Sequence, residues 1–189
     1  MTDIRNAKVA ILATNGFEQS ELEVPQRKLK EAGATVTVVS PESGEIRGWN
    51  HKDWGSPVKV DMALSDARPE DFDAIVLPGG QINPDLLRVN DDALKFIRAF
   101  LDSGKVVAAV CHAPWLLVEL DAVRGRNVTS YKSIRTDVKN AGGKWVDKEV
   151  VVDRGIVTSR NPGDLDAFCA KIIEEIGEGR HKREQRKAG

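Results

Sequence analysis

The sequence K-V-V-A-A-V-C-H-A-P-W-L-L-V-E-L, from Lys105 to Leu120, carries the clearest structural signal in the chain. It begins with a short apolar run, Val106–Val110, of the kind that forms buried parallel strands. Pro114 then suits the first turn of a helix, where the missing N–H of proline costs no hydrogen bond. A strand that turns sharply into a helix with a cysteine at the corner is a nucleophile elbow. We therefore expect Cys111 to lie at the carboxyl end of a buried strand.

This corner also predicts a reactive thiol. Free backbone N–H groups at the start of a helix favour an anion, and the thiolate is the nucleophilic form of cysteine. We therefore expect the sulfur of Cys111 to be reachable and the pKa of its thiol to be lowered. His112 follows directly and is a candidate acceptor for the thiol proton. The alternative for His112 is a surface histidine that caps the helix.

Length and charge limit the classes of function. The 189 residues carry 28 Lys and Arg against 29 Asp and Glu, so no overall field recruits nucleic acid or an anionic membrane. No apolar run approaches the length of a membrane span, and no secretory signal is apparent. Cys111 and Cys169 lack the spacing of a metal site, which favours free thiols in a reducing compartment. We expect a cytoplasmic protein with neither metal nor cofactor.

The remaining sequence alternates between strand and helix patterns. We expect the longer strands at 7–13, 35–40, 73–77 and 106–110, and the longer helices at 20–31, 91–103 and 164–176. We expect shorter elements as an edge strand at 58–60, a helix at 115–120, a strand near 128, a helix at 133–141 and a hairpin at 149–158. Such units predict an α/β fold whose mainly parallel sheet is covered on both faces. One domain is expected over 1–178 and a basic polar tail over 179–189.

Candidate functional residues gather at the carboxyl ends of the predicted strands, where open α/β sheets bind their ligands. The loops 14–21 and 78–85 leave such ends beside the Cys111 corner. Glu18 and Glu21 lie on one helical turn, although acids at a helix start also have a purely structural role. If Glu21 contacts the thiol, we expect it to hold a proton at neutral pH, because a carboxylate would oppose the thiolate.

Backbone donors are expected at the same place. Glycines let backbone approach a ligand closely, and Gly79 and Gly80 follow a predicted strand. Their N–H groups, with those of His112 and Ala113, are expected to bind a developing oxyanion. An ordinary turn at the end of the strand is the alternative.

Two other features have simpler interpretations. Cys169 lies in an apolar helical pattern, so we expect it to be buried and inert. Trp49, His51 and Trp54 lie in a projecting segment over 41–57. These side chains could border a pocket, seal a subunit interface or pack locally.

Five motifs follow one another over residues 7–176. They are V-A-I-L-A-T-N-G-F-E-Q-S-E-L-E-V-P, F-D-A-I-V-L-P-G-G, V-A-A-V-C-H-A-P, R-G-R-N-V-T-S-Y and N-A-G-G-K-W-V-D-K-E-V-V-V-D. In combination and order they resemble the PfpI family of intracellular cysteine peptidase-like proteins, in the superfamily of the Parkinsonism-associated protein deglycase. The resemblance implies a flavodoxin-like three-layer sandwich related to class I glutamine amidotransferase domains.

The same resemblance implies roles for individual residues. Cys111 would be the nucleophile with His112 beside it, Glu21 the acid that contacts the thiol, and Glu18 a further acid. Asp85 falls near an acid that reaches a neighbouring subunit's site in peptidase-like members. A homodimer or a larger homo-oligomer is expected from the habit of the family and from the aromatic segment over 41–57. Asp85 is shorter than the usual Glu of the family.

The family has been assigned peptidase, glyoxalase and glycated-protein deglycase activities. We therefore expect a stress-defence hydrolase with a cysteine nucleophile that acts on small reactive carbonyls, glycated amines or peptides. A chaperone-like stress protein that uses Cys111 as a redox sensor is the alternative. A third interpretation is a structural domain with a vestigial site, favoured by Ala113, which replaces a common Gly, and by the bulky Trp115.

Overall fold

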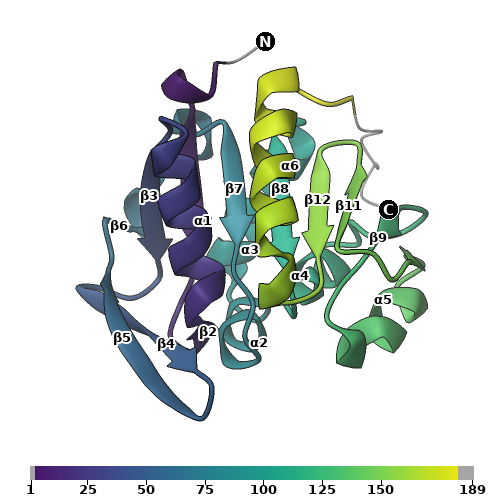
Figure 1. Ribbon diagram of the computed structural model, residues 1–189, viewed down its shortest axis with the longest axis horizontal. Helices are drawn as coiled ribbons and strands as arrows, with labels where there is room; N and C mark the ends of the chain where they lie inside the picture. The colour runs from purple at the N-terminus through teal and green to yellow at the C-terminus, as the bar shows by residue number, and fades with distance from the viewer. Residues whose placement is uncertain (1–2, 183–189) are drawn as a thin grey trace.

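A seven-stranded sheet forms the centre of the computed structural model, which describes residues 3–182. Its strand order is β11-β12-β8-β7-β1-β3-β6 (Figure 1). The strands are β1 (Lys8–Leu12), β3 (Thr35–Ser40), β6 (Met62–Ala63), β7 (Ala74–Leu77), β8 (Val106–Val110), β11 (Val150–Asp153) and β12 (Ile156–Ser159). All neighbouring pairs are parallel except β11 with β12. The predicted mainly parallel sheet is confirmed.

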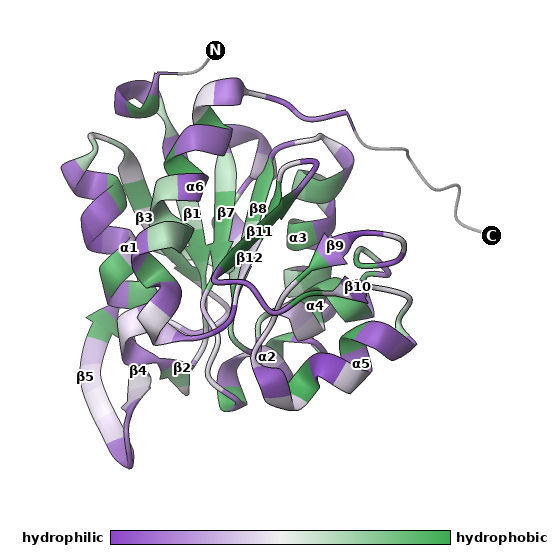
Figure 2. Cartoon of the chain, turned by 45° about the vertical axis from the view of Figure 1, so that its right-hand side comes forward, coloured by the Kyte–Doolittle hydropathy of each residue, from purple (hydrophilic) through white to green (hydrophobic). Residues whose placement is uncertain are grey.

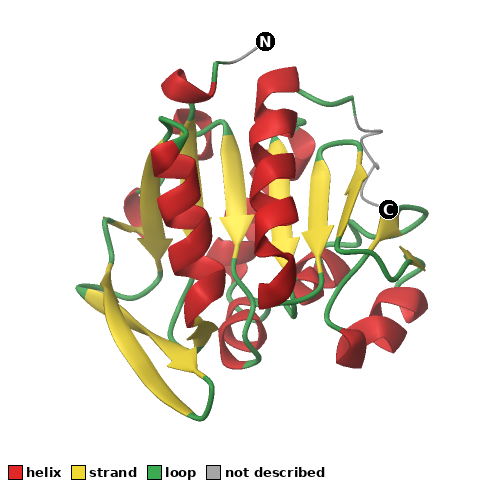
Figure 3. Cartoon of the chain, viewed as in Figure 1, coloured by secondary structure: helices red, strands yellow, loops and turns green. Residues whose placement is uncertain are grey.

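Helices cover both faces of this sheet (Figure 3). On one face, α1 (Gln19–Glu31) packs against α6 (Leu165–Glu178), and on the other α3 (Asp91–Asp102) packs on β7 and β8. Alternate residues of β1 face these two layers, so Ile11 belongs to one apolar core and Leu12 to the other. The central strands are accordingly hydrophobic along their length (Figure 2). This is the predicted three-layer sandwich.

The predicted edge strand at 58–60 is wrong. Val58 and Lys59 belong to β5 (Asp53–Lys59), which pairs with β4 (Glu45–Asn50) and extends through it to β2 (Phe17–Glu18). The Asp61 carboxylate instead accepts the Val38 N–H at the edge of β3, and the chain joins the sheet only at β6. The hairpin of β4 and β5 projects from the domain at the lower left of Figure 1.

Shorter elements complete the fold. They are the helices α2 (Ile82–Leu87), α4 (Pro114–Glu119) and α5 (Arg135–Asn140), and the strands β9 (Asn127–Val128) and β10 (Lys144–Trp145), which pair in a separate small sheet. Short 3₁₀ turns lie at Ile4–Asn6, Leu64–Asp66, Pro69–Asp71, Lys132–Ile134 and Pro162–Asp164. The α2 helix was not predicted. Its buried Asn83 accepts the Thr14 N–H and donates to the Pro78 carbonyl, which ties the loops after β1 and β7 together.

Past α6, the chain turns at Gly179 and returns to the domain. The His181 N–H donates to the Gly104 carbonyl at 2.8 Å. The rest of the predicted basic tail, residues 183–189, lies outside the described residues, and the domain boundary at 178 stays a prediction. Cys169 is buried in the core, as predicted. Among the described residues, no helix is long and apolar enough to cross a bilayer.

Candidate active site

Cys111 occupies a sharp corner directly after β8. Its φ of 64° lies in the left-handed region, which is costly for a residue with a Cβ and needs support from the surrounding structure. That support comes from backbone hydrogen bonds, because its N–H donates to Ser159 at 3.0 Å and its carbonyl accepts from Tyr131 at 2.7 Å. The α4 helix then begins at Pro114. The predicted nucleophile elbow is therefore present.

Glu21 contacts the thiol from the first turn of α1. Its carboxyl group is fully buried, and its Oε2 accepts the Gly79 N–H at 2.8 Å. Its carboxyl group also lies close to the Cys111 side chain. Burial first, and then the charge of Glu18, raise the pKa of Glu21 to about 8. Glu21 is thus protonated at neutral pH, as the sequence predicts for an acid in contact with the thiol.

The predicted ease of ionising Cys111 is wrong for the resting site. Only 5% of the residue is exposed, and burial raises the pKa of its thiol. Negative charge on Glu21 raises this pKa further, while the backbone N–H groups of Gly80 and His112 act in the opposite direction. The α4 helix has six residues and supplies only a small dipole. The thiol therefore needs a base that removes its proton.

His112 is placed to be that base. Its Nδ1 lies 3.1 Å from Cys111 Sγ, and its ring stacks on Tyr131 with the centroids 4.8 Å apart. The Trp115 ring meets it edge-on at 5.3 Å. Burial lowers the pKa of His112, so the imidazole is neutral at neutral pH and able to accept a proton. The sequence left open a surface position for this ring, but His112 is 4% exposed.

The four predicted backbone donors have different surroundings. The N–H groups of Gly80 and His112 point at the Cys111 sulfur. The Gly79 N–H is already bonded to Glu21, and the Ala113 N–H donates to the Val110 carbonyl at 3.0 Å. The Gly80 and His112 N–H groups are therefore the donors beside the sulfur, and the Gly80 N–H also bonds to Glu21.

Glu18 and Asp85 are not equivalent. Glu18 caps α1 by accepting the Glu21 N–H at 3.0 Å, and it also faces the space above the thiol. Asp85 is exposed on α2 and lines a neighbouring hollow of about 250 Å³ with Trp115, away from Cys111 of its own chain. Within one chain, Glu18 lines the cavity above the thiol and Asp85 lies outside it.

A cavity of about 380 Å³ opens above the sulfur. It is lined by the predicted site residues Glu18, Glu21, Cys111 and His112. Trp49 also lines it, so this side chain borders a pocket, which is one of the three alternatives that the sequence left open. Gly80, one of the predicted backbone donors, also lines it. The remaining lining residues were not singled out from the sequence and are Gly16, Gln81, Ile82, Tyr131 and Pro162.

Tyr131 and Ser133 are the site residues that sequence reasoning missed. Tyr131 stacks on His112, and the Ser133 hydroxyl lies 3.1 Å from His112 Nε2. Tyr131 ends the motif R-G-R-N-V-T-S-Y, which was the available signal for this loop.

Comparison with known proteins identifies the family. The model of the DJ-1/PfpI family matches residues 7–175. The chain belongs to the DJ-1/PfpI family. It is 42% identical to "Deglycase PfpI" of Pyrococcus furiosus over 88% of this chain and 98% of that protein. It is 41% identical to "Protein/nucleic acid deglycase 2" of Escherichia coli over 90% and 98% of the two chains.

A solved structure supports the DJ-1/PfpI fold. The chain superposes on Drosophila melanogaster DJ-1beta with a TM-score of 0.81 and 27% identity, covering 92% of this chain and 95% of the other. The flavodoxin-like sandwich implied by the motifs is therefore confirmed.

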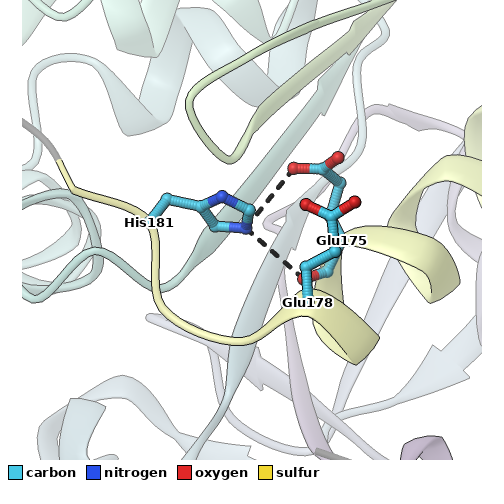
Figure 4. Close-up of side chains that lie close together, drawn as sticks. All are labelled: Glu175, Glu178 and His181. Carbon is cyan, nitrogen blue, oxygen red and sulfur yellow. Dashed lines mark hydrogen bonds and ion pairs between the residues drawn. The ribbon is translucent and has the colours of Figure 1, made fainter. Parts of the chain in front are cut away.

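Residues that could hold a metal lie elsewhere in this DJ-1/PfpI chain. Among the described residues, Glu175, Glu178 and His181 bring ligand atoms within 4.8 Å of one another (Figure 4). His181 Nε2 already pairs with Glu175 Oε2 at 3.3 Å. The group lies at the end of α6 opposite to the Cys111 corner, so it is not part of the reaction centre.

Proposed function

We propose that this DJ-1/PfpI protein is a cysteine-dependent hydrolase that removes reactive carbonyls, or their early adducts on amino groups, as a stress defence in the cytoplasm. The observation that carries the proposal is the Cys111 thiol, 3.1 Å from a neutral imidazole and in contact with a protonated carboxyl group. The deglycase names of two relatives support the substrate class. A free thiol nucleophile also suits a reducing compartment.

The first step assigns a task to each group. His112 Nδ1 takes the thiol proton, and the sulfur attacks the aldehyde carbon, so that an S–C bond forms and the C=O electron pair moves to oxygen. The N–H groups of Gly80 and His112 bind that oxyanion. Glu21 then donates its proton to the oxygen, which gives a hemithioacetal on Cys111.

The later steps return the enzyme to its starting state. For an α-oxoaldehyde, transfer of the C1 proton to C2 through the ionised Glu21 converts the hemithioacetal into a thioester of the hydroxy acid. Water then hydrolyses the thioester. The departing thiolate takes back the proton that His112 holds, and the proton of the new carboxylic acid returns to Glu21. An adduct on an amine enters the same path once its C–N bond breaks and the amine leaves with a proton. The balance is one carbonyl and one water consumed for each hydroxy acid.

The test is the consumption of methylglyoxal, and the release of the free ε-amine from its adduct with Nα-acetyl-lysine, by the purified protein. Cys111→Ser should abolish both activities. Cys169→Ser is the matched control, because Cys169 is buried in the core outside the cavity, and it should keep both. Full activity in Cys111→Ser would refute the proposal.

We also propose that the chain forms a homo-oligomer. The exposed fractions of Ile82, Leu86 and Val89 on and after α2 are 41%, 48% and 79%. Ile82 lines the cavity, and Leu86 follows it one helical turn later in the neighbouring hollow. A second copy would cover this apolar stripe. Light scattering after gel filtration should report a mass above that of one chain, and Leu86→Glu should reduce it. A monomer at micromolar concentration would contradict the proposal.

A further inference from the structure

The His112 imidazole has a partner at both of its ring nitrogens. Nδ1 lies 3.1 Å from Cys111 Sγ, and Nε2 lies 3.1 Å from Ser133 Oγ. Ser133 lies in the 3₁₀ turn Lys132–Ile134. This turn directly follows Tyr131, whose N–H donates to the Cys111 carbonyl. A thiol, an imidazole and a hydroxyl from two separate loops therefore form one hydrogen-bonded line.

The proton count on the ring gives Ser133 a specific task. A neutral imidazole carries one proton, so Nδ1 can take the thiol proton only while Nε2 carries the N–H. A hydroxyl oxygen that accepts from this N–H favours that tautomer. The same bond survives the transfer, because both nitrogens of the imidazolium carry protons.

We propose that Ser133 is the positioning residue that holds His112 in the tautomer and orientation that accept the Cys111 proton, a role that rests on the proposed hydrolase chemistry. Orienting groups of this kind are often carboxylates. Within residues 3–182, no carboxylate hydrogen-bonds to His112, and Ser133 takes that place. A neutral orienter leaves the imidazole uncharged at rest, which agrees with burial as the cause that lowers the pKa of His112.

The structure offers variants that separate this role from simple loop structure. Ser133 is exposed, so Ser133→Ala removes its hydroxyl without opening the core. Ser133→Thr keeps the hydroxyl, and Ser133→Asp adds a negative charge beside Nε2. Ser130→Ala is the matched control in the same loop, because its hydroxyl bonds to Trp145 Nε1 at 2.9 Å and not to His112.

The rate of Cys111 alkylation by iodoacetamide, measured against pH, reports the transfer of its proton. Ser133→Ala should slow alkylation at pH 7 about fivefold, the size expected for one orienting hydrogen bond. Ser133→Thr should restore the rate. Ser133→Asp should move the pH profile toward lower pH by about one unit, because a nearby opposite charge favours the imidazolium. Turnover of methylglyoxal should show the loss in kcat with KM little changed.

Three results would overturn the proposal. The first is an alkylation pH profile like that of the wild type in both Ser133→Ala and Ser133→Asp. The second is alkylation of Ser133→Thr that stays as slow as that of Ser133→Ala. The third is alkylation of Ser130→Ala that is as slow as that of Ser133→Ala. Alkylation requires no carbonyl turnover. A wild-type protein that consumes no carbonyl would therefore refute the proposed function, while the alkylation profiles would still decide the role of Ser133.

Discussion

Replacing Glu21 by Gln should change how stability depends on pH. The folded pKa of Glu21, about 8, lies roughly 3.5 pH units above the usual 4.5. The folded protein binds this proton more tightly than the unfolded chain does. The contribution of the bound proton to the free energy of unfolding is therefore full below pH 4.5 and is lost as the pH rises through 8. At about 1.4 kcal/mol per pH unit, Glu21 costs the wild type about 5 kcal/mol across that window.

Glu21→Gln keeps an oxygen for the Gly79 N–H but cannot ionise. Its free energy of unfolding should match the wild type near pH 5 and exceed it by several kcal/mol near pH 8. Urea denaturation at pH 5, 6, 7 and 8 measures the difference. Glu31→Gln is the matched control at the exposed end of the same helix and should run parallel to the wild type. If the free energy of unfolding of Glu21→Gln also changed with pH as that of the wild type does, the assignment of a buried, protonated Glu21 would be refuted.

Two further substitutions test how the cavity is built. Gly79→Ala would place a Cβ 2.7 Å from the Val110 carbonyl oxygen, so we expect a loss of about 1 to 3 kcal/mol in thermal denaturation. Gly177→Ala is the control, because a Cβ at this position of α6 meets no atom within 4 Å, and its free energy of unfolding should rise by about 0.5 to 1 kcal/mol. Equal effects of the two substitutions would contradict the close packing inferred at Gly79. Asn83→Ala leaves the buried Thr14 N–H unpaired and should cost about 2 to 4 kcal/mol, whereas a change below 0.5 kcal/mol would show that the two loops hold together without it.

Local sequence patterns were enough to predict the scaffold. The apolar run Val106–Val110 followed by Pro114 specifies strand, corner and helix with little help from distant residues. The convergence of Glu21 with Cys111 was also predictable, because parallel strands deliver their carboxyl ends to one edge of the sheet. The proton on Glu21 was also predicted, but its causes are burial and the charge of Glu18 rather than the thiol beside it.

Features that depend on tertiary contacts could not be predicted. The α2 helix has six residues, and the buried amide of Asn83 fixes its place through bonds to two other loops. The contact of Ser133 with His112 depends on how a distant loop folds over the elbow. The thiol pKa was predicted in the wrong direction, because the cost of desolvating Cys111 depends on burial that no local motif reports.

The covalent role of Cys111 can be measured by peptide mapping with mass spectrometry, on protein quenched with acid during turnover of methylglyoxal. We expect a covalent adduct on Cys111 in the wild type and in Cys169→Ser, and none at position 111 in Cys111→Ser, which should also be inactive. Steady consumption of methylglyoxal with Cys111 unmodified, or an unchanged rate in Cys111→Ser, would contradict that role.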